Sequence, residues 1–449
     1  MNSKIFRLLI IVLFILLVFS FIVIPDIFSY LSKIVWFITS ILILFSGIYF
    51  TKKLNFIQFK IKKLFTSFKE KRSSDGISTF SSFAMSLGAR IGVGSLSGIA
   101  IAIYYGGVGT IFWIWVISLI TSVNAYGESY LGVKYHIKKD NQYLGGPSYY
   151  IEKGLKDKKL GIIYAILIIF SYIFGFLTIQ ANTVVISVTN VFNINSFIII
   201  IIILIFSSLV MFKDLKFLTN IISKTVIVMG ILYLSLGLIV MIINYQLLIP
   251  TFILIIKSAF NIKSFSTGFL ATFIIGFQRG IFSTEAGLGT SAIASSATND
   301  TPYKQGVVQL LGVHLTSLII CSITAFIVIS SNYLSIPWDS INGIEIIQSS
   351  FNYHFGSVGK YILMVITVLF AFSTIISGYY YGEVNLKYIN KKISNKSLII
   401  FKLLVLLLLL VGCLVKSPIL WEIIDSLVVL LAIVNIYALL NLRNKIKSN

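Results

Sequence analysis

The sequence predicts an all-α polytopic membrane protein of about twelve spans, in which two extra N-terminal spans precede a five-plus-five inverted repeat with two broken helices. Three observations support this class. Hydrophobic residues make up 57% of the 449 positions and charged residues only 11%, whereas a soluble domain carries about 25% charged residues. Apolar runs long enough to cross a bilayer recur along the chain. Two of these runs are interrupted by glycine and polar residues, which predicts helices that break inside the membrane.

The basic excess of the chain belongs to its loops. Lysine and arginine number 36 against 15 acidic residues, for a formal net charge of +21. In a soluble protein such an excess would suggest a nucleic-acid partner, but here most basic residues lie in short segments between apolar runs, where they set orientation. Cys321 and Cys413 lie inside apolar runs, so we expect two small hydrophobic side chains and no disulfide framework.

Twelve segments approach the roughly 20 apolar residues that a span needs. They cover approximately residues 5–25, 30–50, 77–104, 109–131, 160–189, 196–212, 219–244, 267–297, 305–332, 358–384, 397–415 and 419–439. The first looks like a signal peptide, but its apolar stretch from Leu8 to Ile24 is long and no small-residue cleavage site follows. We therefore expect a retained first span.

The loops alternate between rich and poor in basic residues. Loop 51–72 carries eight lysines and arginines and loop 134–159 carries seven lysines, while the intervening loops hold scattered lysines. Basic loops stay in the cytoplasm, and all the rich loops of a twelve-span chain fall on one side. We therefore expect a multi-pass protein of the cell membrane with both termini cytoplasmic.

Two segments differ from the other spans. Residues 88–98 read Gly-Ala-Arg-Ile-Gly-Val-Gly-Ser-Leu-Ser-Gly, and residues 276–291 read Gly-Phe-Gln-Arg-Gly-Ile-Phe-Ser-Thr-Glu-Ala-Gly-Leu-Gly-Thr-Ser. A glycine costs a helix interior about 1 kcal/mol, and bare backbone at membrane depth must be enclosed by protein or line a cavity. Close packing of helices through small residues is the alternative explanation.

The two interrupted segments are the third and eighth spans, so ten spans divide into two sets of five. An odd number of spans per set reverses the second set, which is the plan of secondary transporters. We accordingly divide the chain into two N-terminal spans with a basic loop (1–76), a first repeat (77–245), a second repeat (246–440) and a cytoplasmic tail (441–449).

Four stretches carry a resemblance to a known family. They are Gly106-Gly-Val-Gly-Thr-Ile-Phe-Trp-Ile-Trp115, Gly145-Gly-Pro-Ser-Tyr-Tyr-Ile151, Arg279-Gly-Ile-Phe-Ser-Thr-Glu-Ala-Gly-Leu-Gly289, and Phe370-Ala-Phe-Ser-Thr-Ile375 followed by Tyr380-Tyr-Gly-Glu383. In this order they resemble the alanine/glycine:cation symporters, also called sodium:alanine symporters, over roughly residues 30–440. The resemblance implies the leucine-transporter type of fold, within the amino acid–polyamine–organocation superfamily. It also implies sodium- or proton-coupled uptake of a small or mid-sized neutral amino acid.

An amino acid is a zwitterion, so a site inside the membrane must offer donors to its carboxylate and acceptors to its ammonium. A broken helix offers both, as free N–H groups at one half-helix end and free carbonyls at the other. The substrate contacts expected from the two breaks are Gly92, Gly94, Ser95, Phe282, Ser283 and Thr284. The first three would meet the carboxylate, and the others would meet the ammonium and the side chain.

The resemblance implies further substrate-facing positions. Gln180 and Asn182 match a polar pair that family members turn toward the site, although Gln180 has the alternative of a helix–helix hydrogen bond. Gly378 matches a position where the family usually has a tryptophan that helps to close the pocket. Loss of that bulk predicts a larger pocket, if no neighbour fills it, and a substrate larger than glycine or alanine, such as glutamine or serine.

A sodium site is implied in the same way. Ser373 and Thr374 match hydroxyl ligands of the family, and backbone carbonyls around Gly88 and Ile91 would complete about five oxygen ligands of the kind that hard cations prefer. The alternative is that each hydroxyl bonds a carbonyl of its own helix. We expect no cofactor beyond this coupling ion, Na⁺ or H⁺.

Arg90 departs from the family pattern, which has a threonine there. Insertion of an arginine at the centre of a span costs roughly 2.5–3.5 kcal/mol of free energy, so we expect Arg90 to have a specific partner or function. Its guanidinium would take the place of sodium and make transport sodium-independent, or bind the substrate carboxylate, or pair with Glu128 or Glu285. We expect Glu285 to pair mainly with Arg279, since both match family positions, and keep Glu285 as a minor candidate for proton coupling.

The functional classes that remain are few. The three histidines are isolated, and the sequence contains no paired-cysteine, metalloprotease or nucleotide-binding motif, so we expect no enzyme. The expected partners are an amino acid, a coupling cation and the lipid bilayer, with no obligate protein partner. The alternative function is an amino-acid sensor or degenerate carrier that binds its ligand without concentrating it.

Overall fold

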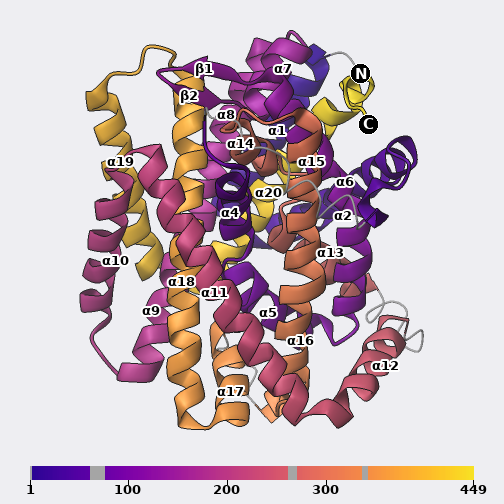
Figure 1. The fold of residues 1–449 in the computed structure, drawn as a ribbon, viewed down its shortest axis with the longest axis vertical. Coiled ribbons are helices and arrows are strands. Elements are labelled where there is room, and N and C mark those ends of the chain that lie inside the picture. The colour runs from indigo at the N-terminus through magenta and orange to yellow at the C-terminus, as the bar shows by residue number, and fades with distance from the viewer. Residues whose placement is uncertain (1–2, 61–75, 261–269, 336–341, 449) are drawn as a thin grey trace.

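The computed structural model describes residues 3–60, 76–260, 270–335 and 342–448, and it is almost entirely helical (Figure 1). Up to residue 192 the elements are α1 (Ser3–Val23), α2 (Pro25–Lys53), η1 (Ile57–Phe59), α4 (Thr79–Arg90), η2 (Val93–Ser95), α5 (Ser97–Gly106), α6 (Thr110–Tyr135), β1 (Ile137–Lys139), β2 (Gln142–Leu144), α7 (Pro147–Gly154), α8 (Lys158–Phe170), η3 (Ser171–Phe176) and α9 (Leu177–Phe192).

The remaining elements follow the same helical pattern. They are α10 (Ser196–Met211), α11 (Leu215–Ile243), η4 (Tyr245–Leu247), α12 (Leu248–Ala259), α13 (Leu270–Thr284), α14 (Thr290–Ser296), α15 (Pro302–His314), η7 (Leu315–Ile320), α16 (Cys321–Ile329), η8 (Tyr333–Ser335), α17 (Gly343–Phe355), α18 (Ser357–Ile389), α19 (Asn395–Leu414), α20 (Ser417–Asn441) and η10 (Arg443–Lys445).

Membrane-length helices dominate the fold. Nine helices of the described residues are long and apolar enough to cross a bilayer, and a tenth results when α4 is joined to η2 and α5 as one bent span. The predicted helical membrane protein is therefore confirmed. Two segments of the predicted twelve fall outside this set: α10 is only 16 residues long, and the predicted span 267–297 begins at positions outside the described residues.

Both ends of the chain lie at one end of the helical bundle. Figure 1 shows the N- and C-termini, α7 and the β1–β2 hairpin together at the top, whereas α12 and α17 lie at the bottom. We call the first of these the hairpin end. The described lysines of loop 134–159 belong to it, in agreement with the predicted alternation of basic loops, while positions 61–72 of the other basic loop lie outside the described residues.

Both predicted interruptions are present. Between α4 and α5 the axis bends by 56°, and residues 285–289 separate α13 from α14. The two broken helices run antiparallel and side by side. An antiparallel bridge joins Gly76, before α4, to Thr298, after α14, and at the other end the Thr272 hydroxyl donates to the Gly106 carbonyl at 2.9 Å. The predicted reversal of the whole second set of five helices stays a prediction.

Helix packing around the breaks separates into two groups. The long helix α6 packs along α13, α14 and α15, and α4 packs against α14 and α15. On the other side, α18 packs against α8, α9 and α11, and also contacts α4. The first broken helix therefore lies between a group built on α6 and a group built on α18.

Several elements were not expected from the sequence. The hairpin and α7 form from loop 134–159, and the short helices α12 and α17 form from other connections. Two π-helical turns, η3 and η7, interrupt long helices. Such turns insert an extra residue into an α-helix and are frequent at functional sites. Here η3 carries Tyr172 and Phe176, which lie close to the breaks.

Candidate functional site

The first break is held open by a side chain from a distant helix. Ile91 ends α4, and Gly92 takes an extended conformation with φ −95° and ψ −160°. The N–H of Val93, which has left the helical pattern, donates to Gln180 Oε1 on α9 at 2.9 Å. The hydrogen bond satisfies a buried donor that the break would otherwise leave unpaired. Gln180 thus contacts the backbone of the break, and its contact with substrate stays a prediction.

Glycine at position 92 is required by close contacts. A Cβ there would lie 2.5 Å from Thr374 Oγ1 and 2.9 Å from Gln180 Oε1, distances that real Cβ atoms do not show. The structure therefore brings together three of the predicted positions, from α9, α18 and the break itself. The predicted contact residue Ser95 is also buried here, but its hydroxyl donates locally to the Gly92 carbonyl at 2.9 Å.

The second break uses left-handed backbone conformations. Glu285, Gly287 and Gly289 have φ values of 53°, 105° and 93°. Glycine adopts these conformations freely, whereas for glutamate they are uncommon. The hydroxyls of Ser283 and Thr284 donate to carbonyls of their own helix, at Arg279 and Gly280, each at 2.7 Å. In this conformation both hydroxyls are used within α13.

Phe282 connects the two breaks. Its ring lies over Gly94, where a Cβ would come within 2.4 Å of Phe282 Cε1. The same ring stacks on Phe176 with centroids 4.8 Å apart and an angle of 7°, and it packs against Trp421 of α20 at 4.9 Å. An aromatic layer from α13, η3 and α20 therefore covers the backbone that we predicted to contact substrate.

The space at Gly378 is filled. A Cβ on Gly378 would lie 2.4 Å from Leu177 Cδ1 and 2.7 Å from Tyr172 Cδ1. Tyr172 and Leu177 therefore occupy the volume that loss of a tryptophan would otherwise open. We expected a larger pocket only if this space stayed free. Because the space is occupied in this conformation, the structure gives no support for a larger pocket.

Asn182 lies away from the breaks. Its side-chain Nδ2 donates to the carbonyls of Gly412 and Val415, at 3.1 and 2.8 Å, at the end of α19. Asn182 follows Gln180 by two positions, which rotates it by about 200° around the helix axis. Gln180 and Asn182 therefore face opposite sides of α9, and the expectation that both face the site is corrected for Asn182.

The predicted sodium ligands converge. The hydroxyls of Ser373 and Thr374 on α18 both donate to the Gly88 carbonyl, at 3.1 and 2.8 Å. Both also bond the Phe370 carbonyl of their own helix, at 2.8 and 3.1 Å. Neutral oxygens from α4 and α18 thus gather at one point, which is the donor set that Na⁺ prefers. The Phe370 carbonyl was not among the predicted ligands, and a role for the Ile91 carbonyl stays a prediction.

Arg90 points away from these hydroxyls. Its guanidinium donates to the Gln309 carbonyl on α15 at 3.1 Å and to Ser291 Oγ on α14 at 2.6 Å. It does not occupy the place where Ser373 and Thr374 meet Gly88. Nor, within the described residues, does it form an ion pair with Glu128 or Glu285, although both carboxylates attract it electrostatically. Contact with a substrate carboxylate stays a prediction.

Arg279 pairs with a residue that we did not predict. Its Nη2 lies 2.5 Å from Asp425 Oδ2 on α20, and the guanidinium lies 4.5 Å from the ring centroid of Trp421. The expected Arg279–Glu285 pair is therefore replaced by a pair between α13 and α20. Helix geometry explains the difference, because Glu285 lies just beyond the end of α13 and follows Arg279 by six positions, which is a rotation of about 240° around the helix axis.

Glu128 and Glu285 support the second break from within. Glu128 Oε1 accepts hydrogen bonds from the N–H of Gly287 and from Asn435 Nδ2, both at 2.8 Å. Glu285 Oε2 accepts from the Thr290 hydroxyl at 2.7 Å. Both side chains are fully buried. Glu128 thus binds a backbone N–H within the interruption, and Glu285 binds the hydroxyl of the first residue of α14.

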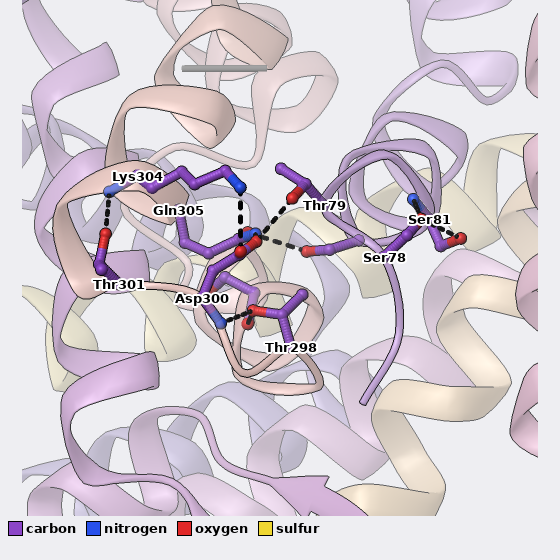
Figure 2. A network of polar contacts seen from close by, with 10 residues as sticks. Ser78, Thr79, Ser81, Thr298, Asp300, Thr301, Lys304 and Gln305 are labelled. Atoms are coloured by element: carbon purple, nitrogen blue, oxygen red, sulfur yellow. Dashed lines mark hydrogen bonds and ion pairs between the residues drawn. The ribbon is translucent and has the colours of Figure 1, made fainter. Parts of the chain in front are cut away.

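A polar network ties the two broken helices together at the hairpin end (Figure 2). Asp300, in the loop between α14 and α15, accepts through Oδ2 from the Thr79 hydroxyl and from Gln305 Nε2, each at 2.7 Å. Its other oxygen lies 3.0 Å from Lys304 Nζ. The first residue of α4 is thereby fixed to the end of the second broken helix and to the start of α15.

The main residues missed from the sequence are Asp425, Asn435, Ser291, Gln309, Tyr172 and Asp300. Each meets one of the two broken helices, or a residue that supports a break, from a position remote in the chain, so spacing along the sequence carried no information about the contact. The available signal was a polar or charged residue inside a span, which is rare and usually functional. Asp425, Asn435 and Gln309 carry that signal.

Comparisons with known proteins agree with this geometry. A sequence profile described as "Sodium:alanine symporter family" matches residues 22–449. The chain is 36% identical over 405 residues to "Probable sodium/glutamine symporter GlnT" of Bacillus subtilis (strain 168), covering 89% of this chain and 84% of that protein. It is 32% identical over 424 residues to "Sodium/alanine symporter AgcS" of Methanococcus maripaludis, covering 91% and 92%.

A solved structure shares the fold. The crystal structure of a mutant of the Eremococcus coleocola manganese transporter matches with a TM-score of 0.53 and 14% identity over 85% of each chain. At that identity the likeness concerns the fold alone. The family match, by contrast, covers nearly the whole chain and both breaks. The chain therefore belongs to the sodium:alanine symporter family, whose members are transporters and not enzymes.

Proposed function

We propose that this protein imports a small or mid-sized neutral amino acid, of the alanine, glycine, serine or glutamine class, together with Na⁺ by alternating access. The observation that carries the proposal is the pair of antiparallel broken helices, in which Phe282 near the end of α13 lies against Gly94 in the interruption of the first broken helix. Broken helices mark substrate sites in secondary transporters. The names of the relatives, which mention sodium with alanine or glutamine, support the same class.

The substrate would bind where the two breaks face each other. Backbone N–H groups near Gly92 and Gly94 supply donors for a carboxylate, and carbonyls at the end of α13 supply acceptors for an ammonium. Phe282 covers Gly94 in this conformation, so binding requires the ring to move aside. Because Tyr172 and Leu177 fill the space at Gly378, we favour the smaller substrates of the class.

Na⁺ is favoured over H⁺ at the meeting point of α4 and α18. The hydroxyls of Ser373 and Thr374 and the carbonyls of Gly88 and Phe370 are neutral oxygens. Such groups coordinate Na⁺ but cannot exchange a proton near neutral pH. Since Arg90 points elsewhere, nothing in its geometry supports sodium-independent transport.

The driving forces are sufficient without ATP. One cation that enters with the substrate gains about 2.3 kcal/mol per 100 mV of membrane potential, and a tenfold ion gradient adds about 1.4 kcal/mol. Together these energies allow the substrate to be concentrated by roughly a few hundredfold. In the proposed cycle, the α6 group rocks against the α18 group within an inverted repeat, 77–245 and 246–440, and both termini stay in the cytoplasm.

Uptake into liposomes tests the proposal. The full-length protein is reconstituted, and radiolabelled alanine and glutamine are supplied with a gradient of NaCl, LiCl or choline chloride, or with a proton gradient alone. We expect accumulation above the external concentration only with inward Na⁺, and its collapse when an ionophore dissipates that gradient. Accumulation with the proton gradient alone would contradict sodium coupling.

The alternative is a sensor or degenerate carrier. Such a protein would bind the amino acid without accumulating it. The same liposomes distinguish the two functions, because saturable binding to the purified protein without uptake into liposomes, under any of the gradients, would replace the transporter with the sensor.

A further inference from the structure

The interior next to the second break contains an unbalanced set of charges. Glu128 and Glu285 are fully buried and Arg90 is 2% exposed. The charges of both carboxylates act on Arg90, and Ser291, which accepts from Arg90 at 2.6 Å, also lies beside Glu128. One guanidinium thus faces two carboxylates. If all three are ionised, the cluster carries one excess negative charge.

The other ion pairs of the described residues contain one acid and one base each. Arg279 pairs with Asp425, Lys304 with Asp300, Lys387 with Glu383, Lys391 with Glu152 and Arg7 with Asp157. The cluster of Arg90, Glu128 and Glu285 differs because a single base serves two acids without touching either at ion-pair distance. A buried charge without compensation costs much free energy, so we expect the folded protein to take up a further positive charge at this cluster.

Several oxygen atoms of this cluster have no partner that meets hydrogen-bond geometry among the described residues. They include Glu128 Oε2, Glu285 Oε1 and the hydroxyls of Tyr172 and Tyr381, and all four residues are at most 1% exposed. Tyr172 and Tyr381 both interact electrostatically with Glu285. Unpaired oxygens that surround an excess negative charge are the surroundings that a cation requires.

The titratable side chains around the two carboxylates come from five elements. They are Arg90 from α4, Tyr150 from α7, Tyr164 from α8, Tyr172 from η3 and Tyr381 from α18. Arg90 is the single base in this set. Tyr164 and Tyr150 use their hydroxyls on the Leu288 carbonyl and on Asn435. The Tyr172 hydroxyl lies beside the Glu285 carboxylate and the Tyr381 hydroxyl lies beside Ser86, so the unpaired carboxylate oxygens Glu128 Oε2 and Glu285 Oε1 remain to face a cation.

We propose that this cluster is a second cation-binding centre, in which the carboxylate of Glu285, supported by Glu128, takes up one monovalent positive charge, Na⁺ or H⁺. The centre is separate from the meeting point of Ser373, Thr374 and Gly88, because the guanidinium of Arg90 binds partners on α14 and α15, whereas the two hydroxyls come from α18. The proposal rests on the proposed cation-coupled function only where it gives the bound cation a role in transport.

The test measures the melting temperature, Tm, of the purified full-length protein. The starting protein is the Ser373→Ala/Thr374→Val variant, in which the other candidate cation site is removed. In the sodium arm, NaCl replaces choline chloride at pH 8.5. In the proton arm, choline chloride is kept and the pH is raised from 6 to 8.5. Each arm is repeated after the addition of Glu285→Gln, which removes one negative charge with little change of shape.

Either source of charge gives a distinct result. If Na⁺ binds, Tm rises by about 2 °C or more as NaCl is added and then saturates, and Glu285→Gln abolishes the rise. If a proton binds, the folded protein holds a proton that an unfolded carboxylate has already released at neutral pH. Stability is then fully present at low pH and is lost as the pH rises, and Glu285→Gln flattens that loss.

The exposed carboxylate Glu422 supplies the matched control. Glu422→Gln removes the same charge from α20 at a position that the structure exposes, and it should keep both responses. Glu128→Gln removes a charge from the cluster itself and should act like Glu285→Gln, which keeps the test valid if one of the two variants fails to fold. Arg90→Gln should enlarge the response, because it leaves two negative charges.

The proposal is overturned if the Ser373→Ala/Thr374→Val protein responds to neither Na⁺ nor pH, or if Glu285→Gln and Glu128→Gln both leave its responses unchanged. These measurements need no transport. Failure of amino acid accumulation in liposomes would remove the proposed function and leave this site standing, and the reverse result is equally distinguishable.

Discussion

Gln180 Oε1 accepts a hydrogen bond from the backbone N–H of Val93 at 2.9 Å, which links the first turn of α9 to the interruption of the first broken helix. The two residues are 87 positions apart in the chain. Gln180 also lies against Gly92, so its amide fills the place where a side chain on that glycine would stand. The shape of the break therefore depends on a helix outside it.

Replacement of Gln180 by alanine should weaken transport. The Val93 N–H would lose its partner in a buried place, which costs about 1–3 kcal/mol, and the loop that we expect to hold the substrate carboxylate would no longer be fixed. We expect kcat/KM for uptake to fall about tenfold or more. The matched control is Gln348→Ala, since Gln348 is also buried and bonds Ser187 away from the breaks. Equal uptake by both variants would contradict the conclusion that Gln180 fixes the backbone of the first break.

Removal of the Thr374 hydroxyl should raise the Na⁺ concentration needed for half-maximal uptake. Thr374→Val keeps the shape of the side chain and takes away one oxygen that meets Gly88 at 2.8 Å. Loss of one ligand of a hard cation should cost about 1–2 kcal/mol, which is a roughly tenfold increase in that concentration. Thr367→Val is the control, because the Thr367 hydroxyl bonds only Leu363 of the same helix among the described residues. An unchanged Na⁺ dependence would rule out Thr374 as a ligand.

A methyl group at position 94 should block the site by contact with one ring. The Cβ of Gly94→Ala would lie 2.4 Å from Phe282 Cε1, so the ring must move. We expect uptake to fall strongly and to recover in part when Phe282→Leu is added, because the smaller side chain relieves the contact. Gly230→Ala serves as the control, since no atom lies within 4 Å of its Cβ position. If Phe282→Leu fails to improve Gly94→Ala, the contact does not explain the defect.

The ion pair between α13 and α20 should contribute to stability far more than an exposed pair. Asp425→Ala leaves Arg279, whose side chain is 8% exposed, without its partner, and an uncompensated buried charge costs about 3 kcal/mol or more. Glu152→Ala breaks a pair in which Lys391 is 64% exposed and should cost at most about 1 kcal/mol.

Thermal unfolding of the two variants measures this difference. The double variant Arg279→Met/Asp425→Leu should regain most of the lost Tm, because it removes both charges at once. Equal Tm values for Asp425→Ala and Glu152→Ala would show that burial of this pair has no energetic consequence.

The positions of the breaks could be predicted from the sequence because the cause is local. Glycine at 92, 94, 287 and 289 disfavours helix wherever it occurs inside a span, and the structure needs left-handed backbone at 287 and 289. The convergence of Ser373 and Thr374 on Gly88 was also expected, but through resemblance to a family and not from spacing along the chain.

The partners of the charged residues could not be predicted in the same way. Arg279 meets Asp425 across 146 positions, and no local pattern indicates which distant helix faces it. The role of Arg90 was left open for the same reason, because its partners Ser291 and Gln309 lie 201 and 219 positions away.

The number of spans could not be predicted from the length of the apolar segments alone. The segment that forms α10 has 16 residues, short of the usual span, and the second broken helix divides its length between two short helices. The second case follows from the left-handed residues Gly287 and Gly289, which interrupt the helix and which a count of apolar residues does not record.

The two broken helices are fastened to each other at both of their ends, by Gly76 with Thr298 at one and by Gly106 with Thr272 at the other. Because they are joined at both ends, the two broken helices cannot move apart at one end, and a tilt of one helix tilts the other. In the proposed alternating-access cycle, the two broken helices should therefore keep their spacing while the substrate site opens first to one side of the membrane and then to the other.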